Sequence, residues 1–193
     1  MNLAETQIHR WSRDEYYRMY DMGLFEGQRV ELIEGVIYEM GAMYSPHATA
    51  ITKTMRVLFR CFGESVVIRP QLPLTLPGAR ASEPEPDLAV VAGSIDDYRA
   101  EHPDSALLII EVAESSLEKD RTIKASLYAR AGIADYWIVN LEDRQVEIHR
   151  DPVPDSERPS GFRYSTVTMH VAEESVSPLF APQTTIAVSD LLP

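Results

Sequence analysis

Apolar and polar residues alternate along much of the chain in a way that predicts short strands. Residues 105–113, SALLIIEVA, form a nearly continuous apolar run, which is typical of a central strand covered on both faces. Residues 29–40 predict a strand pair that turns near Glu34-Gly35. Further extended segments are expected at residues 65–70, 72–76, 88–92, 135–140 and 145–150, with two short ones in the tail after a proline-rich surface loop at 151–161.

Three other segments have the periodicity of amphipathic helices. Ser12 followed by Glu15 is a capping-box pattern, which opens a helix that runs to about Met22. A second helix is predicted within residues 47–62, and a third begins at a capping box and ends near a glycine. The second helix has Ile51, Met55, Leu58 and Phe62 on one face, and the third starts at Ser115 and Glu118 and ends near Ala131-Gly132. Strands interleaved with three helices indicate an α/β or α+β domain, with a mixed central sheet flanked by helices.

The composition suits one globular domain over residues 1–193. Hydrophobic residues make up 45% and charged residues 25% of the chain, which is ordinary for a protein with a sizeable core. The longest apolar runs are too short for a membrane span, and the polar N-terminal start does not resemble a secretory signal. A soluble cytoplasmic protein without a membrane partner is therefore expected. The single cysteine, Cys61, excludes an internal disulfide and a cysteine-based zinc site.

The charge distribution is uneven. A formal net charge of -12 argues against a protein that simply coats nucleic acid. The second predicted helix nevertheless carries Lys53, Arg56 and Arg60 on the face opposite its apolar stripe. This basic face is either an ordinary solvated surface or a contact surface for a nucleic-acid backbone.

Residues 81–92, ASEPEPDLAVVA, place a carboxylate at the mouth of an apolar strand. A residue before proline is driven towards extended conformations, so Glu83-Pro84-Glu85-Pro86 predicts a stiff, extended segment before Asp87. Taken alone, Asp87 is either a solvated strand end or a side chain held in place for a purpose.

Two further charges lie where apolar side chains are expected. Glu111 is embedded in the apolar run at 105–113, on the face shared with Leu107 and Ile109, and a carboxylate there needs a partner. On the next helix, Asp120 and Lys124 lie within the apolar stripe rather than on the polar face where such pairs usually occur. We therefore expect the Lys124 ammonium to meet Asp120 or Glu111.

Asp87, Glu111 and Lys124 together suit phosphodiester hydrolysis. Two carboxylates at neighbouring strand ends can hold a hard divalent cation, Mg²⁺ or Mn²⁺, together with retained waters. A nearby ammonium can position the attacking water and offset charge that develops on a phosphate. The sequence has no P-loop, no G-x-S-x-G elbow and no paired-histidine metal motif.

The same residues carry a resemblance to a known family. A Pro-Asp pair at 86–87, followed by Glu111 within an apolar strand, resembles the PD-(D/E)xK nuclease superfamily. The chain is more closely similar to the Uma-two family, whose members are assigned as restriction endonucleases. The matching segments extend from about residue 12 to 190 and are VELIEGVIYEM, SPH, EPDLAVV, LLIIEVAESS, DRTIKASLYARAGIADYWIVN and SPLF.

The resemblance implies a restriction-endonuclease-like fold and a metal-dependent endonuclease acting on nucleic acid, with DNA as the expected substrate. It implies that Asp87 and Glu111 are the metal ligands. Position 113, two residues after the glutamate, is Ala rather than the lysine of the superfamily, and Lys124 matches the relocated lysine of this family. Glu31 matches an early glutamate that completes the metal site through a water, and His47 matches a histidine that contacts phosphate or a water.

The chain also departs from the family pattern. Val36 follows the turn glycine where an acidic residue is common, and Glu114 replaces the serine after the strand of Glu111. Two other functions stay open: a nuclease-like module that binds nucleic acid or regulates without cutting, and a metal-dependent phosphoesterase with a small substrate. A homodimer would suit the cutting of two strands, but the sequence shows no interface pattern.

Overall fold

The computed structural model describes residues 8–77 and 81–193. A sheet with strand order β3-β4-β5-β6-β7-β8 forms its centre. Neighbouring strands are antiparallel except β5 and β6, which are parallel, so the predicted mixed sheet is confirmed. The strands are β3 (Val67–Pro70), β4 (Leu88–Val91), β5 (Leu108–Ala113), β6 (Asp135–Asn140), β7 (Gln145–Pro154) and β8 (Phe162–Val171).

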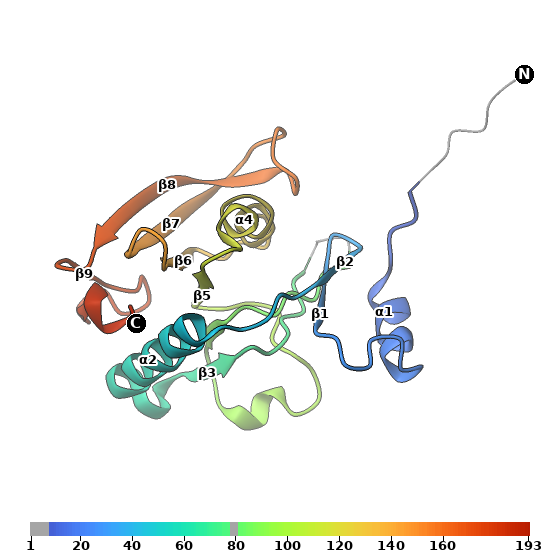
Figure 1. Ribbon diagram of the computed structural model, residues 1–193, viewed down its shortest axis with the longest axis horizontal. Coiled ribbons are helices and arrows are strands. Elements are labelled where there is room, and N and C mark those ends of the chain that lie inside the picture. Colours follow the sequence, from blue (N-terminus) through green and yellow to red (C-terminus); the bar gives the residue numbers. More distant parts are fainter. Residues whose placement is uncertain (1–7, 78–80) are drawn as a thin grey trace, which may run out of the picture.

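Helices cover both faces of this sheet (Figure 1). Helix α2 (Ser45–Phe62) packs Ile51 and Leu58 against the face that carries Leu108 and Ile110. The opposite face, with Ile109, lies under a helix made of α3 (Leu117–Lys119), a π-helical turn η3 (Asp120–Lys124) and α4 (Ala125–Arg130). Because side chains alternate along β5, Glu111 shares the α4 face with Ile109. None of the helices in the described part of the chain is long and apolar enough to cross a membrane.

A separate hairpin extends the molecule beside α1 (Arg13–Asp21), as Figure 1 shows. Strands β1 (Val30–Ile33) and β2 (Val36–Glu39) pair as the sequence predicts, with Gly35 at a φ of 74° in the turn. The predicted capping box of α1 is present, with Ser12 and Glu15 bonded reciprocally. Leu32 also bridges to Glu83, so the hairpin is tied to the segment that leads into β4.

The C-terminal part completes the fold. A short pair, β9 (Ser175–Val176) and β10 (Ile186–Ala187), follows β8. The three 3₁₀ turns in the described ranges are η1 (Gly63–Ser65), η2 (Ile95–Tyr98) and η4 (Val188–Asp190). Val188, Leu191 and Leu192 pack into the core beneath α2, so the last residues of the chain stabilise the position of that helix.

Several local predictions are wrong. Residues 72–76 are not a strand, although Leu74 and Leu76 are buried; Leu74 bonds to Pro84 instead of to a ladder. The third helix is capped at Ser116 without a side-chain bond, so the box at Ser115 and Glu118 does not form. In α2 the buried stripe is rotated, because Thr54 is buried and Met55 is 37% exposed.

The start of the predicted surface loop is also different. β7 continues through residues 151–154 and β8 begins at residue 162, so only residues 155–161 connect the two strands. The prolines at 152 and 154 are accommodated near the end of a hairpin, where a lost ladder donor matters least. After this loop the chain forms the long strand β8 and then the two short strands β9 and β10, where only two short segments were predicted.

Candidate active site

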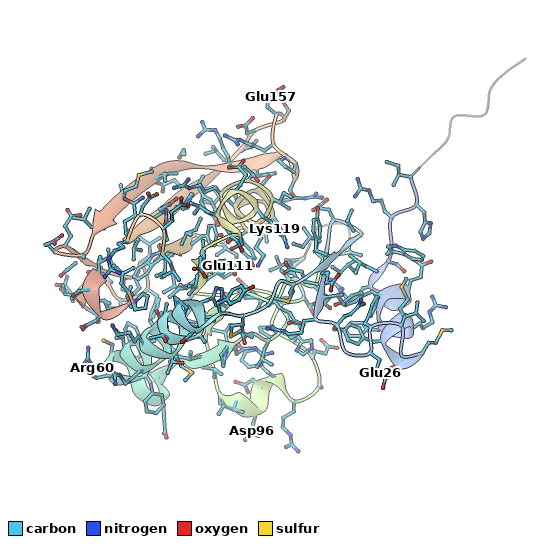
Figure 2. All side chains as sticks on the ribbon, viewed as in Figure 1. Glu26, Arg60, Asp96, Glu111, Lys119 and Glu157 are labelled. Carbon is cyan, nitrogen blue, oxygen red and sulfur yellow. The ribbon has the colours of Figure 1, made fainter. Side chains whose placement is uncertain are left out.

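A cavity of about 240 Å³ opens at the end of β5. Its walls come from the hairpin β1–β2 and the residues after it, the start of α2, the segment before β4, the end of β5 and the helix α3–η3. Figure 2 shows Glu111 and Lys119 on this side of the molecule, between α2 and α4. The predicted catalytic residues Glu31, His47, Asp87, Glu111 and Lys124 all line it. The structure therefore brings together side chains that lie up to 93 positions apart in the sequence.

Asp87 is held rigidly at the entrance to β4. Its Oδ2 accepts a hydrogen bond from the Val112 backbone at 2.8 Å, and its Oδ1 lies 3.1 Å from His47 Nε2 and 3.3 Å from Gln71 Nε2. Burial alone would raise the pKa of this carboxyl, but His47, the Val112 amide and Lys124 outweigh it and lower the pKa. Asp87 is therefore an ionised, preorganised carboxylate rather than a solvated strand end.

Glu111 is buried and accepts hydrogen bonds from three donors. Its Oε1 accepts hydrogen bonds from Lys124 Nζ at 2.9 Å and from the Tyr128 hydroxyl at 2.8 Å. Its Oε2 lies 3.3 Å from the backbone nitrogen of Asp87. Burial raises the pKa of the Glu111 carboxyl to about 8, against the attraction of Lys124. Strongly shifted pKa values of this kind gather at functional sites.

Lys124 is the central cation of the site. Only 5% of the residue is exposed, and its Nζ lies 2.9 Å from Glu111, 3.6 Å from Glu31 and 4.0 Å from Asp120. Burial opposes its charge, but these three carboxylates outweigh burial and raise the pKa of Lys124 well above the ordinary value. The prediction that Lys124 points from the helix towards Glu111 is confirmed.

A second lysine was not predicted from the sequence. Lys119 Nζ lies 2.6 Å from Glu31 Oε1 and 4.5 Å from the centre of the Tyr38 ring. Glu31 is only 1% exposed, and although burial disfavours its charge, Lys124 and Lys119 keep the pKa of its carboxyl below the ordinary value. The β1–β2 hairpin thus contributes an ionised carboxylate that both lysines contact.

The π-helical turn positions these groups on one side of the helix. Asp120 and Lys124 begin and end η3 and are both buried, and Ser116 Oγ donates to Asp120 Oδ2 at 2.6 Å. Inserted π turns often occur at functional sites. The local sequence gives no clear signal for such a turn, so the contact of Lys119 with Glu31 could not be predicted.

His47 connects α2 to the carboxylates. It lies in the first turn of the helix, where free backbone N–H groups favour negative charge. The hydrogen bond to Asp87 raises the pKa of the His47 imidazole in spite of partial burial. Its place beside Asp87 allows it to orient that carboxylate or to contact a bound phosphate.

The donor set fits a hard divalent cation held by few protein ligands. Asp87 and Glu111 supply carboxylate oxygens from adjacent strands, and Mg²⁺ characteristically binds one or two carboxylates while keeping waters and contacting substrate phosphate. Within residues 8–77 and 81–193 no three His, Cys, Asp or Glu side chains are placed to hold a metal ion by themselves. A site for Mg²⁺ or Mn²⁺ here would therefore be completed by water and substrate.

The predicted nucleic-acid-binding residues lie outside this cavity, farther along α2. Lys53 and Arg56 line a shallow depression of about 290 Å³ together with Thr49 and Thr52. Lys53 also donates to the backbone carbonyl of Leu192, and Arg60 pairs with Asp190 at 3.2 Å with both side chains largely exposed. The basic face is thus partly occupied by the C-terminal segment.

Comparison with known proteins agrees with the fold. The structure is similar to the "Crystal structure of a putative nuclease belonging to DUF820 from Anabaena variabilis ATCC 29413", with a TM-score of 0.70 and 15% identity over 92% of this chain and 95% of that chain. At this level of identity the likeness establishes the fold. A search of curated proteins finds no match. A family model described as "Uma2: Putative restriction endonuclease" matches residues 13–189, and the chain therefore belongs to the Uma2 family.

Proposed function

We propose that this protein is a metal-dependent nuclease that hydrolyses phosphodiester bonds, with DNA as its substrate. The observation that carries the proposal is the buried Lys124 ammonium, which lies between the carboxylates of Glu111 and Glu31 in a cavity that also contains Asp87. A buried charge cluster of this kind is expensive for stability alone. Membership of a family described as restriction endonucleases supports the nuclease assignment.

The residues have distinct roles in this proposal. Asp87 and Glu111 would hold Mg²⁺ or Mn²⁺, which when bound supplies Lewis-acid stabilisation of phosphate charge and lowers the pKa of a water. Lys124 donates a hydrogen bond from Nζ to the attacking water or to a phosphate oxygen. Glu31 orients Lys124 from the hairpin side, and His47 fixes Asp87 through Oδ1.

The direct test is cleavage of plasmid DNA and of single- and double-stranded oligonucleotides, with RNA in parallel. Each substrate is incubated with Mg²⁺, Mn²⁺ or a chelator. We expect the metal-dependent activity of the wild type to fall to the chelator level in Asp87→Asn and in Glu111→Gln. Asp135→Asn is the matched control, since Asp135 is a fully buried carboxylate that pairs with Arg150 at 2.8 Å, outside the cavity.

Each outcome assigns a function. Metal-dependent cleavage that is lost in both site variants and kept in Asp135→Asn supports the nuclease. Binding of nucleic acid without cleavage under any metal condition would instead support the module that binds without cutting. Cleavage that persists in both site variants would place the chemistry elsewhere.

A further inference from the structure

Strand β8 is an exposed edge of the central sheet. It pairs with β7 on one side, and no strand pairs with its other side within the described residues. In Figure 1 it lies at the outer margin of the sheet. A long edge strand presents backbone N–H and C=O groups that can pair with another chain, and proteins usually protect such edges with charges, prolines or bulges.

The edge of β8 lacks that protection over most of its length. Residues 164–171, YSTVTMHV, contain no Asp, Glu, Lys or Arg, although a quarter of the whole chain is charged. Val167, Met169 and Val171 form a row of exposed apolar side chains on one face, at 42%, 54% and 47% exposure. Thr166 and Thr168 add a residue type that is enriched in strands.

The charges at the two ends of β8 select the partner. Arg163, whose side chain is 45% exposed and pairs with Asp155 at 3.2 Å, stands at the start of the strand, and Glu173 and Glu174 follow its end. In an antiparallel pair the start of one strand meets the end of the other. Two copies of β8 would therefore bring Arg163 of each copy towards the glutamates of the other, with a neutral centre between them.

Pairing through β8 also reduces the repulsion between two negatively charged copies. A chain of charge -12 repels its own copies over most of its surface, and the middle of β8 is free of acidic residues. Val171 is already bonded to Glu174 through both its N–H and its C=O, which leaves the stretch before it open for pairing. Backbone hydrogen bonds across added strands supply affinity in this mode of association.

We propose that β8 pairs antiparallel with β8 of a second copy, so that the two central sheets join into one continuous sheet across a two-fold axis. Such a closed, isologous contact buries both edges and leaves no further edge of this kind. The interface does not depend on the function of the cavity.

The first measurement is mass in solution, by light scattering and sedimentation velocity. We expect wild type at concentrations up to about 100 µM, above the dissociation constants of most specific interfaces, to show twice the 21.7 kDa of one chain. The double variant Val167→Lys with Met169→Lys should be monomeric, because like charges would face each other across the pair. The control is Met22→Lys with Ile95→Lys, which adds the same charge at exposed apolar residues elsewhere.

The second measurement locates the two-fold axis between the two copies of β8. In a Cys61→Ser background, Thr166→Cys, Val167→Cys and Thr168→Cys are made singly, with oxidised glutathione as the electron acceptor that converts two thiols into one disulfide. An antiparallel pair centred on this stretch brings one of these positions opposite its own copy, within disulfide reach, while Ile95→Cys should not cross-link. A monomeric wild type, a β8 double variant that stays dimeric, or cross-linking equal to that of Ile95→Cys would overturn the proposal.

Discussion

Lys124 is the residue whose charge is least compatible with its surroundings. It is buried within a helix stripe that otherwise packs on the sheet, and three carboxylates lie within 4.0 Å of its Nζ. Glu111 keeps its bond from Tyr128 and Glu31 keeps its bond from Lys119 when Lys124 is removed. These remaining donors make a neutral replacement at this position feasible.

We predict that Lys124→Met folds and still binds Mg²⁺ but hydrolyses DNA more slowly by a factor of about 10²–10³, as expected for the loss of one transition-state donor. Methionine keeps much of the aliphatic stem while removing the charge. Single-turnover cleavage and calorimetric Mg²⁺ titration are the measurements. Arg150→Met is the control, since it removes the cation that pairs with the buried Asp135 outside the cavity; equal cleavage by Lys124→Met and wild type would make Lys124 a structural partner only.

At the scale of single residues, the sequence predicts which charged side chains are buried better than it predicts the partners that they contact. Asp87, Glu111 and Lys124 could be identified because each interrupts an apolar pattern, and such an interruption requires compensation. Lys119 and Gln71 do not interrupt an apolar pattern, because the sequence pattern predicts polar residues at both positions. Their contacts, with Glu31 and Asp87, depend on pairings across the fold that no local periodicity encodes.

At the scale of elements, the β1–β2 hairpin carries Glu31 to the cavity and depends on its turn. Gly35 has a φ of 74°, its N–H donates to Ala81, and its carbonyl accepts from Trp11. A Cβ added to Gly35 would lie 2.7 Å from Arg10 Cβ. The turn is therefore both conformationally restricted and closely packed.

We predict that Gly35→Ala lowers the free energy of unfolding by about 2–3 kcal/mol, through the unfavourable φ and the clash with Arg10. Gly27→Ala is a matched control, because Gly27 has a φ of 78° but a Cβ added there would meet no atom within 4 Å. That control should lose only about 1 kcal/mol. Chemical denaturation gives both values, and equal losses would show that the packing against Arg10 contributes nothing.

A second interaction between elements is a pair of hydrogen bonds that links η3 to β7. Arg121 donates two hydrogen bonds to Glu147, at 2.9 and 2.6 Å, and Asn140 donates another at 2.8 Å. Burial would raise the pKa of the Glu147 carboxyl, but His149, Arg121 and Asn140 outweigh burial and lower the pKa from 4.5 to about 2. The ionised form of Glu147 therefore stabilises the folded protein.

We predict that Glu147→Gln is less stable than wild type by about 2–3 kcal/mol at neutral pH. Because the folded pKa of Glu147 is depressed, this difference is fully present above pH 4.5 and shrinks as the pH falls towards 2. Urea unfolding of both proteins between pH 2 and 7 measures it, and effects of other carboxylates cancel in the comparison. If the stability difference between wild type and Glu147→Gln does not change with pH, the shape of the Glu147 side chain rather than its charge causes the difference.

The sequence predicts the existence and order of the helices and strands better than it predicts their caps, irregular turns and buried positions. The central strand β5, the hairpin and the helix order are predicted because long apolar runs and capping residues are local signals. The π turn, the shifted cap at Ser116 and the buried Thr54 are set by packing against the sheet. The register of α2 is likewise decided by the C-terminal residues that pack beneath it.

At the scale of the whole molecule, the net charge of -12 must be reconciled with the polyanionic substrate that we propose. The cavity itself is acidic, so affinity for a nucleic-acid backbone would have to come from basic residues around it. The basic face of α2 begins roughly 9 Å from His47 at Lys53 and reaches Arg56 at roughly 14 Å along the helix axis. Lys53 and Arg60 are engaged by the C-terminal segment, whereas Arg56 is exposed beside Thr52 and Thr49 in the shallow depression.

We predict that Arg56→Gln weakens DNA binding and makes the dependence of log K on log salt shallower by about 0.9, the value for one lost phosphate contact. Binding is measured with the cleavage-deficient Asp87→Asn protein at several salt concentrations. Arg158→Gln is the control, because Arg158 is an exposed arginine beside Glu157, which Figure 2 places far from Arg60 at the end of α2. Both variants lose one positive charge, so a general effect of net charge would change them equally. Unequal slopes therefore assign the contact to α2, and equal slopes would make the basic face an ordinary solvated surface.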